Sequence, residues 1–550
     1  MDVTTLIIVA LAIVLLSIWL TSGKRSKKEL PGPTGLPIVG YIPFMTKKPY
    51  VKLTELSKTY GPVYKVRLGA IDIVVITDYD LIKEAFARDS FMGRPPDLPF
   101  ELSEETITTG AFNGMPWKEQ RRFSLHMLRD LGFGKTQMEE DIKEEILELL
   151  ERMSAHVGKP TKFSYILAPS MSNNIASLVF GKRLKYNDPQ RQRLDNSIGE
   201  IGRLAGSVSW QLFFPWLRKF LSYFNIGDKG KLVTVLHDVK EYCREEMDEH
   251  EKTLDPNNIR SFMDSYLIEI QKQSSDPNST FKRKAEKGKK LSTSSTRRMG
   301  SILGEEMEEH EKTLDPNNIR SFMDSYLIEI QKQSSDPNST FKKEVLTDLA
   351  RAFFAAGSDT VRVTVDWMLL VSAAYPRIQK RIHAEIDEVI GPDRFPTWQD
   401  RLRMPFTEAA IIELMRWRTI VPLNIMRYTL QDTELNGYFI PKHTRILAVI
   451  WALDNDKKLW GNDVQEYKPE RMLSEDGTKV VKPEHAIPFS VGKRSCPGKT
   501  LAEIEVFLYL VAILQKFEVS KPPGKELDLE GELGVSLQPI RQELCLKLRH

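Results

Sequence analysis

Apolar residues recur with helical spacing over most of the chain after Tyr50. A period of about 3.6 residues indicates amphipathic helices. Five stretches show this spacing most clearly: 138–154, 231–250, 344–372, 376–390 and 407–417. β-rich runs are short and confined to 63–77 and 435–450. The regular alternation of strand and helix that builds a doubly wound sheet is missing. The sequence therefore predicts a mainly helical fold with minor β structure.

The composition limits the classes of function. Of 550 residues, 41% are hydrophobic and 28% charged, so the chain can bury a sizeable core. A net charge of +3 gives no overall attraction to nucleic acid. Three cysteines, Cys243, Cys496 and Cys545, cannot build a disulfide framework. This composition favours a globular protein of a reducing compartment with no nucleic-acid partner.

The N-terminus carries an apolar run from Leu6 to Leu20, which residues 3–5 extend to about eighteen residues. That length just suffices to cross a bilayer. A cleavable signal peptide would carry positive charge before the run. Here Asp2 precedes it, and four basic residues follow it between 24 and 28. Because positive charge stays on the cytosolic side, the sequence predicts an uncleaved transmembrane anchor at 1–23 and a cytosolic remainder.

Residues 24–40 hold this basic stretch and the proline-rich string Leu-Pro-Gly-Pro-Thr-Gly-Leu-Pro at 30–37. A plain linker would have a similar composition. No second span of eighteen apolar residues follows. We therefore expect one cytosolic domain over 41–550, preceded by a linker or a proline-rich hinge at 24–40.

Residues 245–282 recur almost unchanged at 305–342, with Asp248 replaced by Glu308. Repeat proteins use three or more diverged copies, so two near-identical copies do not indicate a solenoid. A linker at 283–304, rich in lysine, arginine and serine, separates the copies. We interpret the repeat as duplicated sequence, with a regulatory insertion as the alternative. A surface loop of this length adds little closure entropy, so the fold can accommodate it.

Near the C-terminus, residues 489–498 read Phe-Ser-Val-Gly-Lys-Arg-Ser-Cys-Pro-Gly and lead into a long apolar helical pattern. Gly492 and Gly498 allow a sharp turn and close approach to a flat ligand. Pro497 suits the first turn of the following helix. A sulfur at a helix N-terminus is favoured as the thiolate. The alternative for a lone cysteine is an inert core residue.

This string resembles the haem-binding loop of the cytochrome P450 family, Phe-x-x-Gly-x-Arg-x-Cys-x-Gly, at every specified position. The resemblance implies the cytochrome P450 fold and a b-type haem. Cys496 would be the axial ligand of the iron, and the loop residues Phe489, Gly492 and Gly498 would contact the cofactor.

Residues 356–360 read Ala-Gly-Ser-Asp-Thr within the helical stretch 344–372. A glycine inside a helix costs about 1 kcal/mol against alanine, so it needs a reason. Close packing against a neighbouring helix is one such reason. The string also resembles the family's oxygen-binding groove. On that resemblance Asp359 and Thr360 are the catalytic residues that deliver protons to bound oxygen.

Glu413 and Arg416 lie three residues apart, the spacing of an ion pair on one helix face. Such pairs are usually solvated surface. These two residues resemble the family's Glu-x-x-Arg helix, and Arg471 would complete a buried network that supports the cysteine loop.

Trp117 and Arg121 share a helix face and resemble the family's Trp-x-x-x-Arg helix, whose N–H donors bind a haem carboxylate. By resemblance, Arg427 and Arg494 are further donors of this kind. Seven apolar residues are candidates for the substrate pocket, although several would suit an ordinary core equally well: Phe112, Phe353, Phe354, Val421, Leu423, Val535 and Leu537.

The resemblance implies a monooxygenase of the endoplasmic reticulum membrane, single-pass, with its catalytic domain on the cytosolic face. It would insert one oxygen atom from O2 into a lipophilic steroid, fatty acid or xenobiotic. Its electrons would come from NADPH through a cytochrome reductase, with cytochrome b5 as a second candidate partner. The alternatives are a haem-binding protein without turnover and a product inactivated by the duplication.

Overall fold

The computed structural model describes residues 29–96, 113–130, 136–180 and 343–550, with isolated positions at 183, 185–186, 213–214, 314, 321, 325 and 329–330. The chain forms two compact units, each assembled from segments distant in sequence. Unit 1 takes the described residues within Met1–Pro99, Val208–Tyr223 and Ile412–Cys496. Unit 2 takes those within Phe100–Ser207, Phe224–Ile411 and Pro497–His550.

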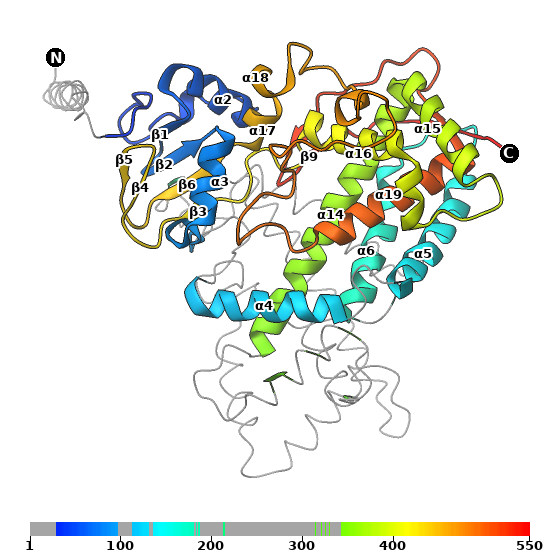
Figure 1. Ribbon diagram of the computed structural model, residues 1–550, viewed down its shortest axis with the longest axis horizontal. Coiled ribbons are helices and arrows are strands. Elements are labelled where there is room, and N and C mark those ends of the chain that lie inside the picture. The colour runs from blue at the N-terminus through cyan, green and yellow to red at the C-terminus, as the bar shows by residue number, and fades with distance from the viewer. Residues whose placement is uncertain are drawn as a thin grey trace, which may run out of the picture. The chain divides into compact units, whose positions relative to one another are not determined.

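Unit 1 contains the longer strands (Figure 1). Its N-terminal elements are η1 (Ile42–Phe44), α2 (Pro49–Tyr60), β1 (Val63–Leu68), β2 (Ile71–Ile76), α3 (Tyr79–Ala87) and η2 (Asp89–Phe91). Its later elements are β3 (Arg427–Tyr428), β4 (Thr433–Leu435), β5 (Tyr438–Ile440), β6 (Arg445–Ala448), α17 (Ile450–Asp454), α18 (Lys457–Trp460) and η6 (Pro469–Met472). Helix α16 (Pro405–Arg418) begins in unit 2 and ends in unit 1.

Four strands of unit 1 form one sheet in the order β1, β2, β6, β3. β1 and β2 are antiparallel, β2 and β6 are parallel, and β3 returns antiparallel to β6. Neighbouring apolar residues of β1, β2 and β6 enter different cores, because side chains alternate across a sheet. One core joins Val74 and Ile76 to Phe86 of α3, and the other joins Ile73 and Val75 to α2.

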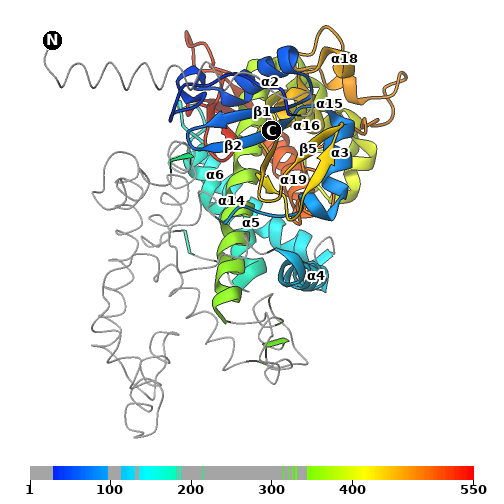
Figure 2. The same cartoon turned by 90° about the vertical axis from the view of Figure 1, so that its left-hand side faces the viewer.

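Unit 2 is mostly helical. Its elements are α4 (Gly114–Asp130), α5 (Thr136–Ser154), α6 (Ser164–Phe180), α14 (Lys343–Ala374), α15 (Pro376–Val389), η5 (Trp398–Arg403), α19 (Lys499–Lys516), β7 (Phe517–Ser520), β8 (Glu532–Leu533), β9 (Leu537–Gln538) and β10 (Cys545–Leu548). Helix α14 packs against α6 and α19, which pass beside it in Figure 2. An unbroken run of buried residues in α19, 504–514, marks a helix enclosed on all sides.

The expected helices at 138–154, 344–372, 376–390 and 407–417 correspond to α5, α14, α15 and α16, and the β-rich runs hold β1, β2, β5 and β6. The mainly helical fold with minor sheet is therefore confirmed. The stretch 231–250 lies outside the described residues.

Within the described ranges, no helix is long and apolar enough to cross a bilayer. The anchor expected at 1–23 lies outside those ranges, as do the first repeat copy and the linker at 283–304. From the second copy, Ser321 and Ser325 are described, and both are buried.

Candidate functional site

The cysteine loop of unit 1 is closed by its own backbone. The amide of Cys496 donates to the Phe489 carbonyl at 3.0 Å, and the amide of Ser495 donates to the Gly492 carbonyl at 3.0 Å. Cys496 is an exposed residue at the end of this loop. Its exposure argues against the alternative of an inert core cysteine. Helix α19 begins three residues later, and Pro497 precedes its N-cap instead of entering its first turn as expected.

Gly492 has a structural reason to be glycine. Its φ is +77°, in the left-handed region, and a Cβ added there would lie 2.1 Å from the Phe86 carbonyl oxygen. Any side chain would therefore push the loop away from the end of α3. Phe86 was not predicted from the sequence, because its role comes from a neighbour some four hundred residues away.

Three arginines of unit 1 lie near this loop or strand β3. Arg427 is 1% exposed, and its guanidinium lies 4.3 Å from the centre of the Phe86 ring. Arg494 donates from Nε to the Met92 carbonyl at 3.0 Å. Arg94, which the sequence analysis missed, is buried and donates to the Met426 carbonyl at 2.6 Å. The only available signal was its place in the tight Gly-Arg-Pro-Pro string at 93–96.

The structure brings Glu413, Arg416 and Arg471 together in unit 1. Arg416 forms two hydrogen bonds with the Glu413 carboxylate, Nε to Oε2 at 2.7 Å and Nη2 to Oε1 at 2.8 Å. Arg471 Nε reaches the same Oε1 at 3.3 Å. Glu413 is fully buried. Arg416 also donates to the carbonyls of Asp454 and Val464, so the network connects α16 with the end of α17 and with the chain that follows it.

Helix α14 of unit 2 runs without a break through Ala356–Thr360. A Cβ on Gly357 would lie 2.4 Å from Cδ1 of Ile175 in α6. Close helix packing therefore accounts for this glycine. The hydroxyl of Thr360 donates to the Ala356 carbonyl at 2.9 Å, which is the usual bond of a threonine to the preceding helical turn.

Asp359 is engaged at both carboxylate oxygens. Oδ1 accepts from Arg362 Nη2 at 2.7 Å, and Oδ2 accepts from Ser536 Oγ at 3.0 Å. The side chain is 12% exposed. Asp359 is therefore held by two hydrogen bonds and is largely shielded from solvent.

Trp117 and Arg121 share one face of α4 in unit 2, with the guanidinium carbon 5.9 Å from the indole centre. Trp117 is buried and Arg121 is partly exposed. This stacking orients the arginine and keeps both groups on one side of the helix.

The described pocket candidates fall in both units. In unit 2, Phe353 and Val535 are partly exposed, while Phe354 and Leu537 are buried. In unit 1, Val421 is partly exposed and Leu423 packs on the core beneath the sheet. Leu537 is packed so completely that it acts as core. Phe112 lies outside the described residues.

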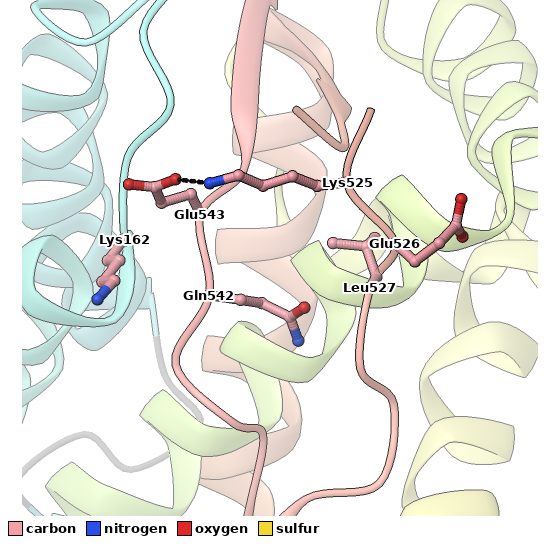
Figure 3. Close-up of a pocket in the computed structure, with 6 residues that line it drawn as sticks. All are labelled: Lys162, Lys525, Glu526, Leu527, Gln542 and Glu543. Carbon is pink, nitrogen blue, oxygen red and sulfur yellow. Dashed lines mark hydrogen bonds and ion pairs between the residues drawn. The ribbon is translucent and has the colours of Figure 1, made fainter. Parts of the chain in front are cut away.

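A hollow of about 280 Å³ lies on unit 2, lined by Lys162, Lys525, Glu526, Leu527, Gln542 and Glu543 (Figure 3). Lys525 Nζ and Glu543 form an ion pair across it at 2.6 Å. The ion pair lowers the pKa of Glu543. Sites for lipophilic molecules have mostly apolar walls, so this charged hollow does not suit such a substrate.

Comparison of the sequence with known proteins identifies the family of the chain. The family model for Cytochrome P450 matches residues 30–285 and 282–546, in two segments that meet at the end of the first repeat copy. Cytochrome P450 18a1 of Drosophila melanogaster is 33% identical over 546 residues, covering 98% of this chain and 90% of that protein. Human cytochrome P450 2J2 is 32% identical, and the match covers 95% of this chain and 92% of that protein. Cytochrome P450 2J1 of Oryctolagus cuniculus is also 32% identical, over 98% of this chain and 95% of that protein. The chain therefore belongs to the cytochrome P450 family of haem-dependent monooxygenases.

Proposed function

We propose that this chain inserts one oxygen atom from O2 into a lipophilic small molecule, at a haem held by Cys496. The observation that carries the proposal is the exposed cysteine in a loop that matches the family string and is folded tightly against Phe86. Steroids, fatty acids and xenobiotics are the substrate classes to test.

The donor set of unit 1 fits an iron porphyrin. A cysteine thiolate is a soft ligand for haem iron. The guanidinium groups of Arg94, Arg427 and Arg494 suit the two carboxylates of a porphyrin, because guanidinium presents paired N–H donors to a carboxylate. When bound, the haem supplies the activation of O2 and the transfer of oxygen.

The protein would hold and orient this group. The helix dipole of α19, which begins three residues after Cys496, favours the ionised sulfur. By family resemblance, Trp117 and Arg121 of α4 would be further donors to a haem carboxylate. The buried Glu413–Arg416–Arg471 network would keep the chain before the loop in place.

Asp359 and Thr360 are the groups we propose for proton delivery. The hydroxyl oxygen of Thr360 can accept a hydrogen bond while its O–H donates to the Ala356 carbonyl, and the O–H can donate to another group after the hydroxyl turns. Asp359 can exchange a proton once Arg362 or Ser536 releases it. The partly exposed Phe353 and Val535 are the proposed apolar contacts for substrate in unit 2.

For localisation we propose an N-terminal anchor at 1–23 in the endoplasmic reticulum membrane, with the domain 41–550 on the cytosolic face. The apolar run and the basic residues after it support this orientation. There a membrane-bound reductase would deliver electrons from NADPH, with cytochrome b5 as a second donor.

The test is replacement of Cys496 by serine, with Cys545→Ser in β10 as the matched control. Each full-length protein is reduced, treated with CO and measured for the Soret band of thiolate-ligated haem and for haem content. We expect the band to disappear in Cys496→Ser and to persist in the control. A thiolate band that survives Cys496→Ser refutes the assignment.

Turnover is tested separately, with membranes that carry the protein and a reductase, over a panel of lipophilic compounds. Oxygenated products formed with NADPH support the proposed reaction. A thiolate band without NADPH consumption would indicate a haem-binding protein, and a chain that binds no haem would indicate a product inactivated by the duplication.

A further inference from the structure

A buried group of polar and charged side chains joins α14 to the hairpin formed by β8 and β9, and α14 contacts β9 within unit 2. Arg362 is 6% exposed, although it carries a charge. Its Nη2 donates to Asp359 Oδ1 at 2.7 Å and lies 3.3 Å from Gln538 Oε1. Ser536 Oγ donates to the other oxygen of Asp359 at 3.0 Å. We call these four residues the α14 clamp.

The same hairpin is fixed once more by the helix. The indole Nε1 of Trp367 donates to the Leu537 carbonyl at 2.8 Å. Gly531, with φ at +79°, lies so close that a Cβ there would be 2.9 Å from a ring carbon of Trp367. Three successive residues, 536–538, are therefore hydrogen-bonded to α14, and Ser536 and Leu537 are fully buried.

Arg362 keeps its charge within this group. Burial alone would lower the pKa of Arg362, but the carboxylates of Asp359 and Asp366 hold it above its ordinary value. Arg362 Nη1 lies 3.6 Å from Asp366, which in turn accepts from Ser164 of α6. Burial raises the pKa of Asp366. Arg362 is therefore charged in the folded chain and forms its ion pair with Asp359 in this state.

The hairpin depends on such contacts for its conformation. Its two strands are two residues long, and hairpins this small are not stable alone. Its turn carries Val535, the partly exposed residue beside clamp member Ser536. The position of Val535 is thus set by side chains of α14 more than by the strand pairing.

We propose that Arg362 is a positioning residue for substrate selection: through Asp359 and Gln538 it fixes the hairpin that presents Val535. The proposal rests on the proposed function, which assigns Val535 to the substrate. Asp359 would then have two roles, because the carboxylate proposed for proton delivery also holds the hairpin through Arg362 and Ser536.

The experiment compares full-length Arg362→Met and Arg362→Lys with the wild type, and uses Arg377→Met, an exposed residue of α15, as the control. Amide hydrogen exchange is followed over 531–538, and product ratios are measured with a substrate that is oxidised at two positions. Loss of one charged hydrogen-bond partner should raise local exchange by about tenfold to a hundredfold. We expect Arg362→Met to show this increase together with a changed product ratio, Arg362→Lys to recover part of both, and the control to match the wild type.

Unchanged exchange over 531–538 in Arg362→Met overturns the clamp, and faster exchange with an unchanged product ratio overturns its role in selection. If Arg362→Met does not fold, Ser536→Ala takes its place, because it removes the other bond to Asp359 with a minimal change in volume. Asp359→Asn separates the two duties: an amide still accepts from Arg362, so the hairpin should stay protected while proton delivery is lost. Absence of the thiolate band in the wild type would refute the proposed function, whereas the exchange measurement would still decide the clamp.

Discussion

Replacing Glu505 by glutamine should change how the stability of the protein depends on pH. Glu505 lies in the middle of α19, 1% exposed. Its Oε2 has no hydrogen-bond partner among the described residues. Burial raises the pKa of this carboxyl to about 8 from its ordinary 4.5, and a hydrogen bond with Asn174 opposes the rise only in part. Tyr509 lies near it and does not supply a positive charge.

The sign follows from proton binding. At pH values between 4.5 and 8 the folded chain keeps this proton and the unfolded chain releases it. The stabilisation is therefore complete below pH 4.5 and is lost as the pH rises toward 8. The two pKa values imply a loss of about 3 kcal/mol between pH 5.5 and pH 8. Glutamine cannot ionise, so Glu505→Gln removes this loss.

The assay is urea unfolding of the full-length chain at pH 5.5, 6.5 and 8, with stability taken from midpoint and slope. Glu503→Gln on the same helix, where the side chain is partly exposed, is the matched control. We expect the advantage of Glu505→Gln over the wild type to grow with pH by about 3 kcal/mol, while the control runs parallel to the wild type. Equal pH dependence in Glu505→Gln and the wild type would show that this carboxyl is not neutral in the folded chain.

Two further changes test the surroundings of the cysteine loop. Arg416→Met leaves the carboxylate of Glu413 buried beside one remaining arginine, so it should destabilise the protein by about 3–5 kcal/mol in urea unfolding; a loss below 1 kcal/mol would mean the pair is not buried as described. Gly492→Ala adds a methyl group against a carbonyl at a positive φ, so haem content per protein should fall by at least about half. The control is Gly437→Ala, which is also at positive φ but has no atom within 4 Å of the added carbon, and it should retain its haem.

Local pattern accounts for what could be predicted of the fold. α15 begins at Pro376 and repeats its apolar residues over a single face, so a window of fourteen residues contains the signal. α14 was equally predictable, because its apolar repeat continues on both sides of Gly357 and the helix runs through this glycine. The order of the strands in the sheet could not be predicted, since β2 pairs with β6 across more than three hundred residues of sequence. Pairing of distant strands depends on the whole fold and leaves no mark in a short window.

The candidate site divides in the same way. The cysteine loop was readable because its residues are consecutive and its turn depends on its own glycines. Arg94 escaped notice, since its partners are backbone carbonyls just before the distant strand β3 and carbonyls have no sequence signature. The Glu413 pair with Arg416 follows from helical spacing, whereas its bond with Arg471 spans 58 residues and was expected only through family resemblance.

By itself, then, the sequence determined the helical class, the family and the residue types of the chemistry, because periodicity and consecutive motifs are local properties of a chain. Only the tertiary structure decided what those residues contact. In the folded chain Gly357 packs against Ile175, and Asp359 accepts hydrogen bonds from Arg362 and Ser536. Contacts of this kind join segments brought together by burial of apolar surface, which is a property of the folded chain as a whole.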